Sequence, residues 1–109
     1  MFDERTDTLI KQAVDAEFEN AKKMWGDSYH SEHEGYAVLL EEVDEVKREY
    51  KNIRRLMKHL WYMTKGTEPR DQRLIYGLEQ TATNLAMEAC QVAAVCRKIM
   101  GSRKTVGVV

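Results

Sequence analysis

Proline and cysteine are scarce in this chain of 109 residues, and long apolar runs are missing. The one proline, Pro69, leaves long stretches in which nothing interrupts a helix. Cys90 and Cys96 fall within one predicted helix, too far apart along its axis for a disulfide, so we expect free, mostly buried thiols. No apolar run approaches the roughly 20 residues of a membrane-spanning helix. Because the sequence also opens with charged residues and not with a signal peptide, we expect a cytoplasmic protein.

The chain also lacks an excess of either charge. It has 17 basic and 18 acidic side chains, for a formal net charge of −1. General nucleic-acid binders and binders of anionic membranes normally carry a basic excess, so we expect neither as a partner. Apolar residues make up 43% and charged residues 32% of the chain, which is typical of a globular protein, and the length suits one domain.

Apolar residues recur at helical spacing in three segments. We predict helices over about residues 3–25 and 31–65, and a third that starts between residues 67 and 71 and ends near residue 100. Ser31 and Glu34 have the spacing of a capping box, in which the serine oxygen accepts a backbone N–H and the glutamate reaches back. The second helix is therefore expected to begin at Ser31.

The sparse glycines stand where these helices should end. Gly26, Gly66 and Gly101 each follow a periodic segment, and Pro69 is compatible with the first turn of the third helix. We therefore expect one helical domain over residues 1–101 and a flexible tail over residues 102–109.

The second and third segments carry long apolar rows in which spacings of three and four residues alternate. In the second segment the row is Tyr36, Leu39, Val43, Val46, Tyr50, Ile53, Met57, Leu60 and Thr64, and in the third it is Ile75, Leu78, Ala82, Leu85, Ala89, Val92, Cys96 and Ile99. This pattern predicts a long antiparallel hairpin. Because the first helix is too short to cover it, the expected fold is an all-α bundle of three helices completed by oligomerisation, as a homodimer or homotetramer.

Carboxylates gather beside these rows. At 100° per residue, Glu42 and Glu45 share one flank of the second helix, and Glu88 and Gln91 share one flank of the third. In a hairpin that turns near residue 67, positions whose numbers add to about 134 stand at the same height. The pairs Glu45 with Glu88 and Glu42 with Gln91 each add to 133. We therefore expect the carboxylates of the two helices to lie together.

Carboxylates held close together repel one another, and a cation would relieve the repulsion. Oxygen ligands favour Mg²⁺ or Mn²⁺, so Glu42, Glu45, Glu88 and Gln91 are the predicted metal ligands. The alternative is a solvated acidic flank paired with basic neighbours, for which Lys47, Arg48 and Lys51 are available.

The same residues carry a resemblance to a known family. The segments HEGYAVLLEEVDEVKRE and EACQVAAVCRKIM resemble the MazG-like all-α nucleotide pyrophosphohydrolases, particularly the short phage and prophage members. The resemblance implies an E-x-x-E pair and an E-x-x-D pair that hold Mg²⁺. It also implies hydrolysis of nucleoside triphosphates to monophosphate and pyrophosphate by a dimer or larger bundle. Here Glu42, Glu45 and Glu88 match the pairs, and Gln91 stands where the family has aspartate.

The resemblance also assigns roles beyond the metal. One of Glu41, Glu42 and Glu45 would orient or deprotonate water, and the sequence does not choose among them. Lys98 lies seven residues after Gln91 on the same flank, which makes it the candidate phosphate ligand.

Two other interpretations remain open. A catalytically silent scaffold that keeps the family fold for oligomerisation would account for the missing aspartate. A coiled-coil adaptor unrelated to the family would make the matched heights of the carboxylates accidental. Of the two tryptophans, Trp25 ends the first helix and is a possible neighbour of the site, whereas Trp61 lies near the hairpin tip, where packing is the expected role.

Overall fold

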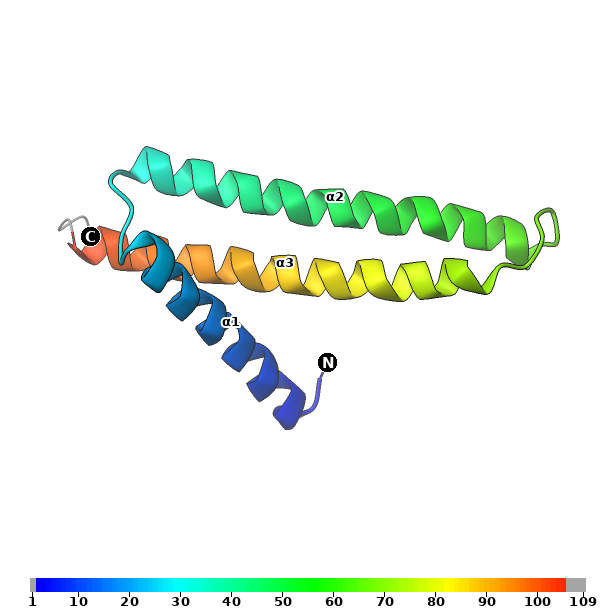
Figure 1. Cartoon of the computed structure of the whole chain (residues 1–109), viewed down its shortest axis with the longest axis horizontal. Helices are drawn as coiled ribbons and strands as arrows, with labels where there is room; N and C mark the ends of the chain where they lie inside the picture. The colour runs from blue at the N-terminus through cyan, green and yellow to red at the C-terminus, as the bar shows by residue number, and fades with distance from the viewer. Residues whose placement is uncertain (1, 106–109) are drawn as a thin grey trace.

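The computed structural model describes residues 2–105, with side chains up to Gly101, and contains three α-helices and no strand in this part of the chain (Figure 1). They are α1 (Glu4–Trp25), α2 (Glu32–Thr64) and α3 (Gln72–Thr105). The helices α2 and α3 lie side by side as a long antiparallel hairpin, and α1 packs against α3 near the open end of the hairpin. The predicted all-α fold of three helices is confirmed.

Local side-chain chemistry sets the ends of α1 and the start of α2. Asp3 caps α1, and Gly26 ends it with a φ of +88°, which favours glycine. At the start of α2, Ser31 Oγ accepts the backbone N–H of Glu34 over 3.1 Å. The Glu34 carboxylate accepts the backbone N–H of His30 over 3.3 Å, one residue earlier than in a reciprocal capping box.

The loop between α2 and α3 differs in one respect from the prediction. Gly66, with a φ of +83°, follows the end of α2 as expected. However, α3 begins at Gln72, so Pro69 lies in the loop and not in the first helical turn. Asp71 takes over the capping role, since its Oδ1 accepts the backbone N–H of Arg73 over 3.0 Å.

The predicted end of α3 is wrong. The helix continues through Gly101 to Thr105, because glycine inside a helix lowers stability by only about 1 kcal/mol relative to alanine and does not by itself end it. Of the flexible tail predicted over residues 102–109, the first four residues are therefore helical. Residues 106–109 lie outside the described part of the chain.

The hairpin has the register expected from its turn. A Cβ added at Gly35 would lie 3.2 Å from Ile99 Cγ1, and one added at Gly77 would lie 3.9 Å from Leu56 Cδ1. Residues whose numbers add to about 134 therefore stand at the same height, as a 1.5 Å rise per residue on both helices requires.

The core of a single chain is thin. The molecule measures 60 × 32 × 24 Å, and among its described residues Gly35, Ala94 and Lys98 are the buried ones. The apolar row predicted on α2 divides into two. Its members facing α3 are half-buried (Leu39, Val46, Ile53, Leu60), whereas the others are exposed (Tyr36, Val43, Tyr50, Met57, Thr64). An isolated hairpin thus leaves much of its apolar surface in water.

Polar and aromatic contacts hold α1 against α3. Asp15 accepts a hydrogen bond from Arg97, whose guanidinium also lies 5.2 Å from the centre of the Phe18 ring. Lys22 approaches the same ring at 5.1 Å, and α1 has no fully buried residue. The Arg97 contacts with Asp15 and Phe18 thus join the two helices, although none of the residues of α1 is fully buried.

The cysteines are free, as expected, but Cys96 is exposed and only Cys90 is half-buried. The expectation of mostly buried thiols therefore fails for Cys96, because its row on α3 faces solvent. None of the helices in the described part of the chain has the length and apolarity that a membrane span requires.

Candidate functional site

Three carboxylates meet between α2 and α3. Glu42 and Glu45 come from adjacent turns of α2, and Glu88 comes from α3 at the same height. One oxygen of each lies within 4.8 Å of an oxygen of the other two, and all three side chains are half-buried. Among the described side chains, no other three His, Cys, Asp or Glu residues come together in this way. The hairpin register thus brings together the three residues that helical spacing predicted.

The proximity of these groups changes their acidity. A hydrogen bond with Glu45, followed by burial and by the charges of Glu45, Glu42 and Glu49, raises the pKa of Glu88 from 4.5 to about 7. Burial, followed by the charges of Glu45 and Glu41, raises the pKa of Glu42. Glu88 in this cluster therefore binds a proton more readily than a separate glutamate does.

Gln91 also belongs to this cluster. With its amide nitrogen turned toward the carboxylates, it donates to Glu88 Oε2 over 2.9 Å and to Glu42 Oε2 over 3.1 Å. In the opposite orientation the amide oxygen would face only acceptors, so the nitrogen-inward orientation is the satisfied one. In this structure, Gln91 therefore links two carboxylates as a donor, whereas the sequence predicted it as a metal ligand.

A pocket of about 860 Å³ opens beside Glu42 and Gln91. It lies where α1, the following loop and both hairpin helices meet. Its lining residues are Glu17, Asn20, Ala21, Met24, Trp25, Tyr29, His30, Glu34, Val38, Glu41, Glu42, Gln91, Ala94, Val95 and Lys98. A pocket of this size has room for a nucleotide-sized ligand.

Lys98 is the basic side chain of this pocket. Only 3% of its surface is exposed, and its Nζ lies 4.3 Å from the centre of the Tyr29 ring. Burial, followed by the charges of Glu42 and Glu34, raises the pKa of Tyr29, so the phenol stays neutral beside the ammonium. The ring and the ammonium form a cation–π pair in the wall of the pocket.

The other predicted residues fall at different distances from the cluster. Glu41 is exposed and lines the pocket but does not join the three carboxylates. Trp25 lines the pocket from the end of α1, and 73% of its surface is exposed. Trp61 lies on the exposed side of α2 close to its end, where Lys65 contacts its ring.

Sequence analysis missed the side of the site that α1 and its loop supply. Tyr29, Glu17 and Asn20 line the pocket, yet none belongs to an apolar row or a metal motif. Their position depends on how α1 crosses α3, which helical spacing does not determine. The one available signal is Glu34, whose capping role fixes the loop next to Tyr29.

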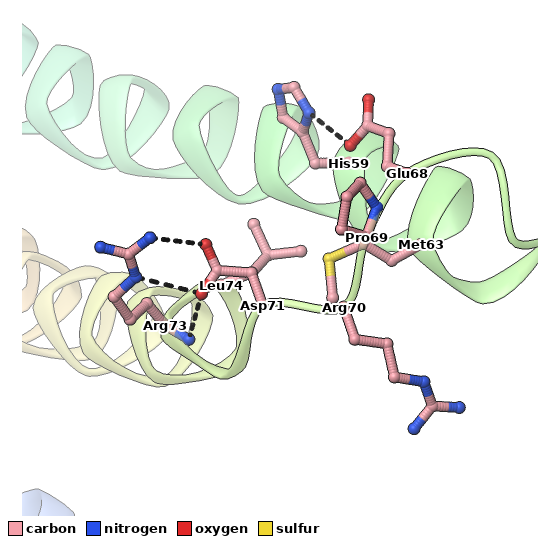
Figure 2. Close-up of a pocket in the computed structure, with 8 residues that line it drawn as sticks. All are labelled: His59, Met63, Glu68, Pro69, Arg70, Asp71, Arg73 and Leu74. Carbon is pink, nitrogen blue, oxygen red and sulfur yellow. Dashed lines mark hydrogen bonds and ion pairs between the residues drawn. The ribbon is translucent and has the colours of Figure 1, made fainter.

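A second pocket, of about 510 Å³, lies at the hairpin tip (Figure 2). Two pairs of its charged side chains are in contact. Arg73 donates to both Asp71 oxygens over 3.1 Å, and His59 Nδ1 lies 3.6 Å from Glu68 Oε2. These contacts connect the loop to the end of α2 and to the start of α3. We assign this pocket no ligand.

No protein-family model matches the chain, and searches of curated proteins and of solved structures find no match either. The sequence and structure together establish an all-α protein of three helices with a carboxylate cluster beside a pocket.

Proposed function

We propose that this protein is a Mg²⁺-dependent nucleotide pyrophosphohydrolase of the MazG-like kind, converting nucleoside triphosphates to monophosphate and pyrophosphate. The observation that carries the proposal is the position of the carboxylate cluster, which reaches through Glu42 into a pocket that also contains the buried Lys98. Phosphoanhydride hydrolysis requires acidic metal ligands and a basic phosphate ligand close together, and Glu42 and Lys98 line this one pocket.

The residues present fit a divalent cation that prefers oxygen. Glu42, Glu45 and Glu88 would hold it, since their oxygens already lie within 4.8 Å of one another. Gln91 would turn its amide oxygen inward to join them. Bound Mg²⁺ would supply charge neutralisation for the triphosphate, and Mn²⁺ is the expected substitute.

The chain's own residues would carry out the remaining work. Lys98 would hold a phosphate, and Tyr29 and Trp25 would wall the pocket against water. Water adds across the α–β phosphoanhydride bond, so that a new P–O bond forms and the bridging P–O bond breaks. One of Glu41, Glu42 and Glu45 accepts the proton of that water, and pyrophosphate leaves.

The test of the metal site is thermal unfolding at pH 8 with EDTA, Mg²⁺ or Mn²⁺. A site that is about 90% occupied at 10 mM metal raises stability by about 1.4 kcal/mol, or roughly 5 °C for a domain of this size. We expect this rise in wild type and in Asp44→Asn, an exposed control on the same helix, and its loss in Glu45→Gln. Absence of the rise in wild type would refute the metal site.

The test of the activity is pyrophosphate release from a panel of nucleoside triphosphates. We expect Mg²⁺-dependent release that Glu45→Gln abolishes. Lys98→Met keeps the apolar stem and removes the charge, so it should raise KM about tenfold or more while leaving the metal-induced stabilisation unchanged. Equal nucleotide affinity in Lys98→Met and wild type would remove Lys98 from the substrate site.

A second candidate function is a scaffold without catalysis. Its support is the Gln91 amide, which already satisfies Glu42 and Glu88 without a metal. A scaffold predicts no specific stabilisation by Mg²⁺ and no pyrophosphate release with any nucleotide. The same two measurements therefore separate the candidates.

A further inference from the structure

The second half of α2 carries an exposed surface of one charge. Residues 47–58 contain six of the chain's 17 basic side chains, and Glu49 is the one acidic residue among them. All six basic side chains are exposed, and they are Lys47, Arg48, Lys51, Arg54, Arg55 and Lys58. We call these six residues the basic face.

Helical geometry turns the basic face away from the rest of the molecule. At 100° per residue, its side chains fall within an arc of about 120°. The centre of this arc lies nearly opposite Ile53 and Leu56, which are half-buried on the side of α2 that faces α3. The same rotation places Glu49, also half-buried, on the inner side of the helix. Figure 1 shows α2 along one edge of the molecule, so its outer side is open to a partner.

The basic face has no acidic partner in the part of the chain that the structure describes. None of its side chains makes an ion pair with a described residue. Lys47, Arg48 and Lys51 therefore do not pair with the acidic flank, although the sequence left that interpretation open. Instead, basic side chains neighbour one another at spacings of three and four residues, as Lys51 neighbours Arg54 and Arg55. Because like charges at these spacings lower helix stability, a bound anion would relieve a cost that the free chain carries.

We propose that the basic face binds double-stranded DNA through its phosphate backbone. The face extends about 16 Å along the helix axis, a length over which B-form DNA presents about ten phosphates. The DNA major groove is about 12 Å wide and admits an α-helix, whose diameter with side chains is about 10–12 Å. Arg48 and Arg55 stand on one edge of the basic face, and Lys47 and Arg54 stand on the other. The two edges can thus reach phosphates of the two strands that border the groove.

The composition of this surface favours duplex DNA over other polyanions. Proteins that hold single strands stack the bases on aromatic side chains, and no aromatic residue of 47–58 falls within the arc of the basic face. A helix that binds an anionic membrane inserts its apolar side, but the half-buried side of α2 packs against α3. Duplex RNA has a deep and narrow major groove, which excludes a helix.

The net charge of the whole chain conceals this surface. A formal net charge of −1 averages the basic face with acidic residues elsewhere, including Glu32, Glu34, Glu41 and Asp44 in the first half of the same helix. Because the two charges are separated along α2, a local basic surface remains, and such a surface is the electrostatic footprint of a nucleic-acid binder. The expectation of no nucleic-acid partner, which rests on the net charge, therefore does not extend to the basic face.

Fluorescence anisotropy of a labelled DNA duplex of about 20 base pairs, titrated with the full chain in EDTA, tests the basic face independently of the metal site. The logarithm of the association constant should fall with the logarithm of the salt concentration with a slope of about −5, as expected for six phosphate contacts. Arg55→Gln/Lys58→Gln should raise Kd about tenfold or more at 50 mM salt and reduce the steepness of the slope by about 2.

Lys11→Gln/Lys23→Gln is the matched control, since it removes the same charge from exposed positions on α1. It should bind DNA as wild type does, and both double variants should keep the wild-type circular dichroism spectrum because all four side chains are exposed. A wild-type chain that does not bind the duplex would overturn the proposal. Equal weakening in the two double variants would overturn it as well, because binding would then follow net charge and not the basic face.

Competition tests the choice of duplex DNA. Single-stranded DNA of the same sequence, duplex RNA and vesicles of phosphatidylcholine with phosphatidylserine should each displace the labelled duplex less effectively than unlabelled duplex DNA at equal phosphate concentration. Any one of these competitors that matches duplex DNA would refute the assignment of duplex DNA as the partner.

Discussion

At the scale of single residues, Glu88 links the chemistry of the site to the stability of the fold. Its pKa of about 7 in the folded protein exceeds the ordinary 4.5, with the hydrogen bond to Glu45 as the largest cause. The folded chain therefore binds more protons than the unfolded chain between these values. The stabilisation is fully present below pH 4.5 and is lost as the pH rises through 7.

Metal-free protein should therefore unfold at a higher temperature at pH 5.5 than at pH 8. Because Glu88 is only partly buried, solvent screening limits the expected difference to a few degrees. Thermal unfolding in EDTA at the two pH values measures it. Glu88→Gln should lose most of the difference, and Asp44→Asn should keep it. A Glu88→Gln protein with the wild-type difference would show that the pH dependence arises elsewhere.

Gln91 sets how strongly the site depends on a cation. Gln91→Asp removes a donor that serves Glu42 and Glu88 and adds a fourth carboxylate. In EDTA its unfolding midpoint should fall below that of wild type by several degrees, and 10 mM Mg²⁺ should raise it by more than the wild-type increment. Gln80→Asp, an exposed substitution on the same helix, should match wild type. An unchanged Mg²⁺ increment in Gln91→Asp would separate Gln91 from the metal site.

At the scale of the helices, sequence periodicity predicted α2, α3 and their register, and hence the meeting of Glu42, Glu45 and Glu88. These features follow from local rules, since apolar spacing sets the face of a helix and the turn sets the register. The crossing of α1 does not follow from such rules. An ion pair and the ring of Phe18 are among its contacts with α3, and helical spacing predicts neither, so the Tyr29 wall of the pocket was missed.

Helical spacing also could not predict which side chains are buried in the folded chain. The position of Lys98 on its helix suggested a phosphate ligand but not its burial, and in the structure only 3% of Lys98 is exposed and its ammonium lies against the Tyr29 ring. The single apolar row predicted on α2 proved to be two, one facing α3 and one facing solvent. An apolar row whose spacings alternate between three and four residues is wide enough to contact two neighbouring helices. The sequence alone does not say how many neighbouring helices are present.

Gly35, at the start of α2, packs closely against both α3 and the loop that precedes α2. A Cβ at Gly35 would lie 3.2 Å from Ile99 and 3.4 Å from Tyr29. Gly35→Val should therefore destabilise the protein by about 1–3 kcal/mol, because the added methyl groups overfill this contact. Ala37→Val, exposed two residues later, is the control for the helix propensity of valine and should lose much less. Urea unfolding measures both, and equal losses would contradict the close packing at Gly35.

At the scale of the whole molecule, one chain has little core of its own, and this should appear in its stability. Gly35, Ala94 and Lys98 are the buried residues in the described part of the chain, whereas Tyr36, Tyr50 and Met57 on α2 are at least half exposed. Folding of an isolated chain thus buries too little apolar surface to offset much chain entropy. A second copy, as the sequence predicts, would supply the missing burial, so that folding and association would be coupled.

Coupled folding and association make stability depend on concentration. The thermal midpoint of wild type should rise by several degrees when the protein concentration increases about 100-fold, since mass action favours the folded dimer. Ala86→Glu, which puts a charge among exposed apolar side chains of α3, should show a lower midpoint that no longer changes with concentration. Thr83→Glu, exposed on another side of the same helix, should follow wild type. Differential scanning fluorimetry and calorimetry together cover this range of protein concentrations. A wild-type midpoint that stays constant over this range would mean that a single hairpin with α1 is stable by itself. The apolar rows would then have to be explained without a second copy.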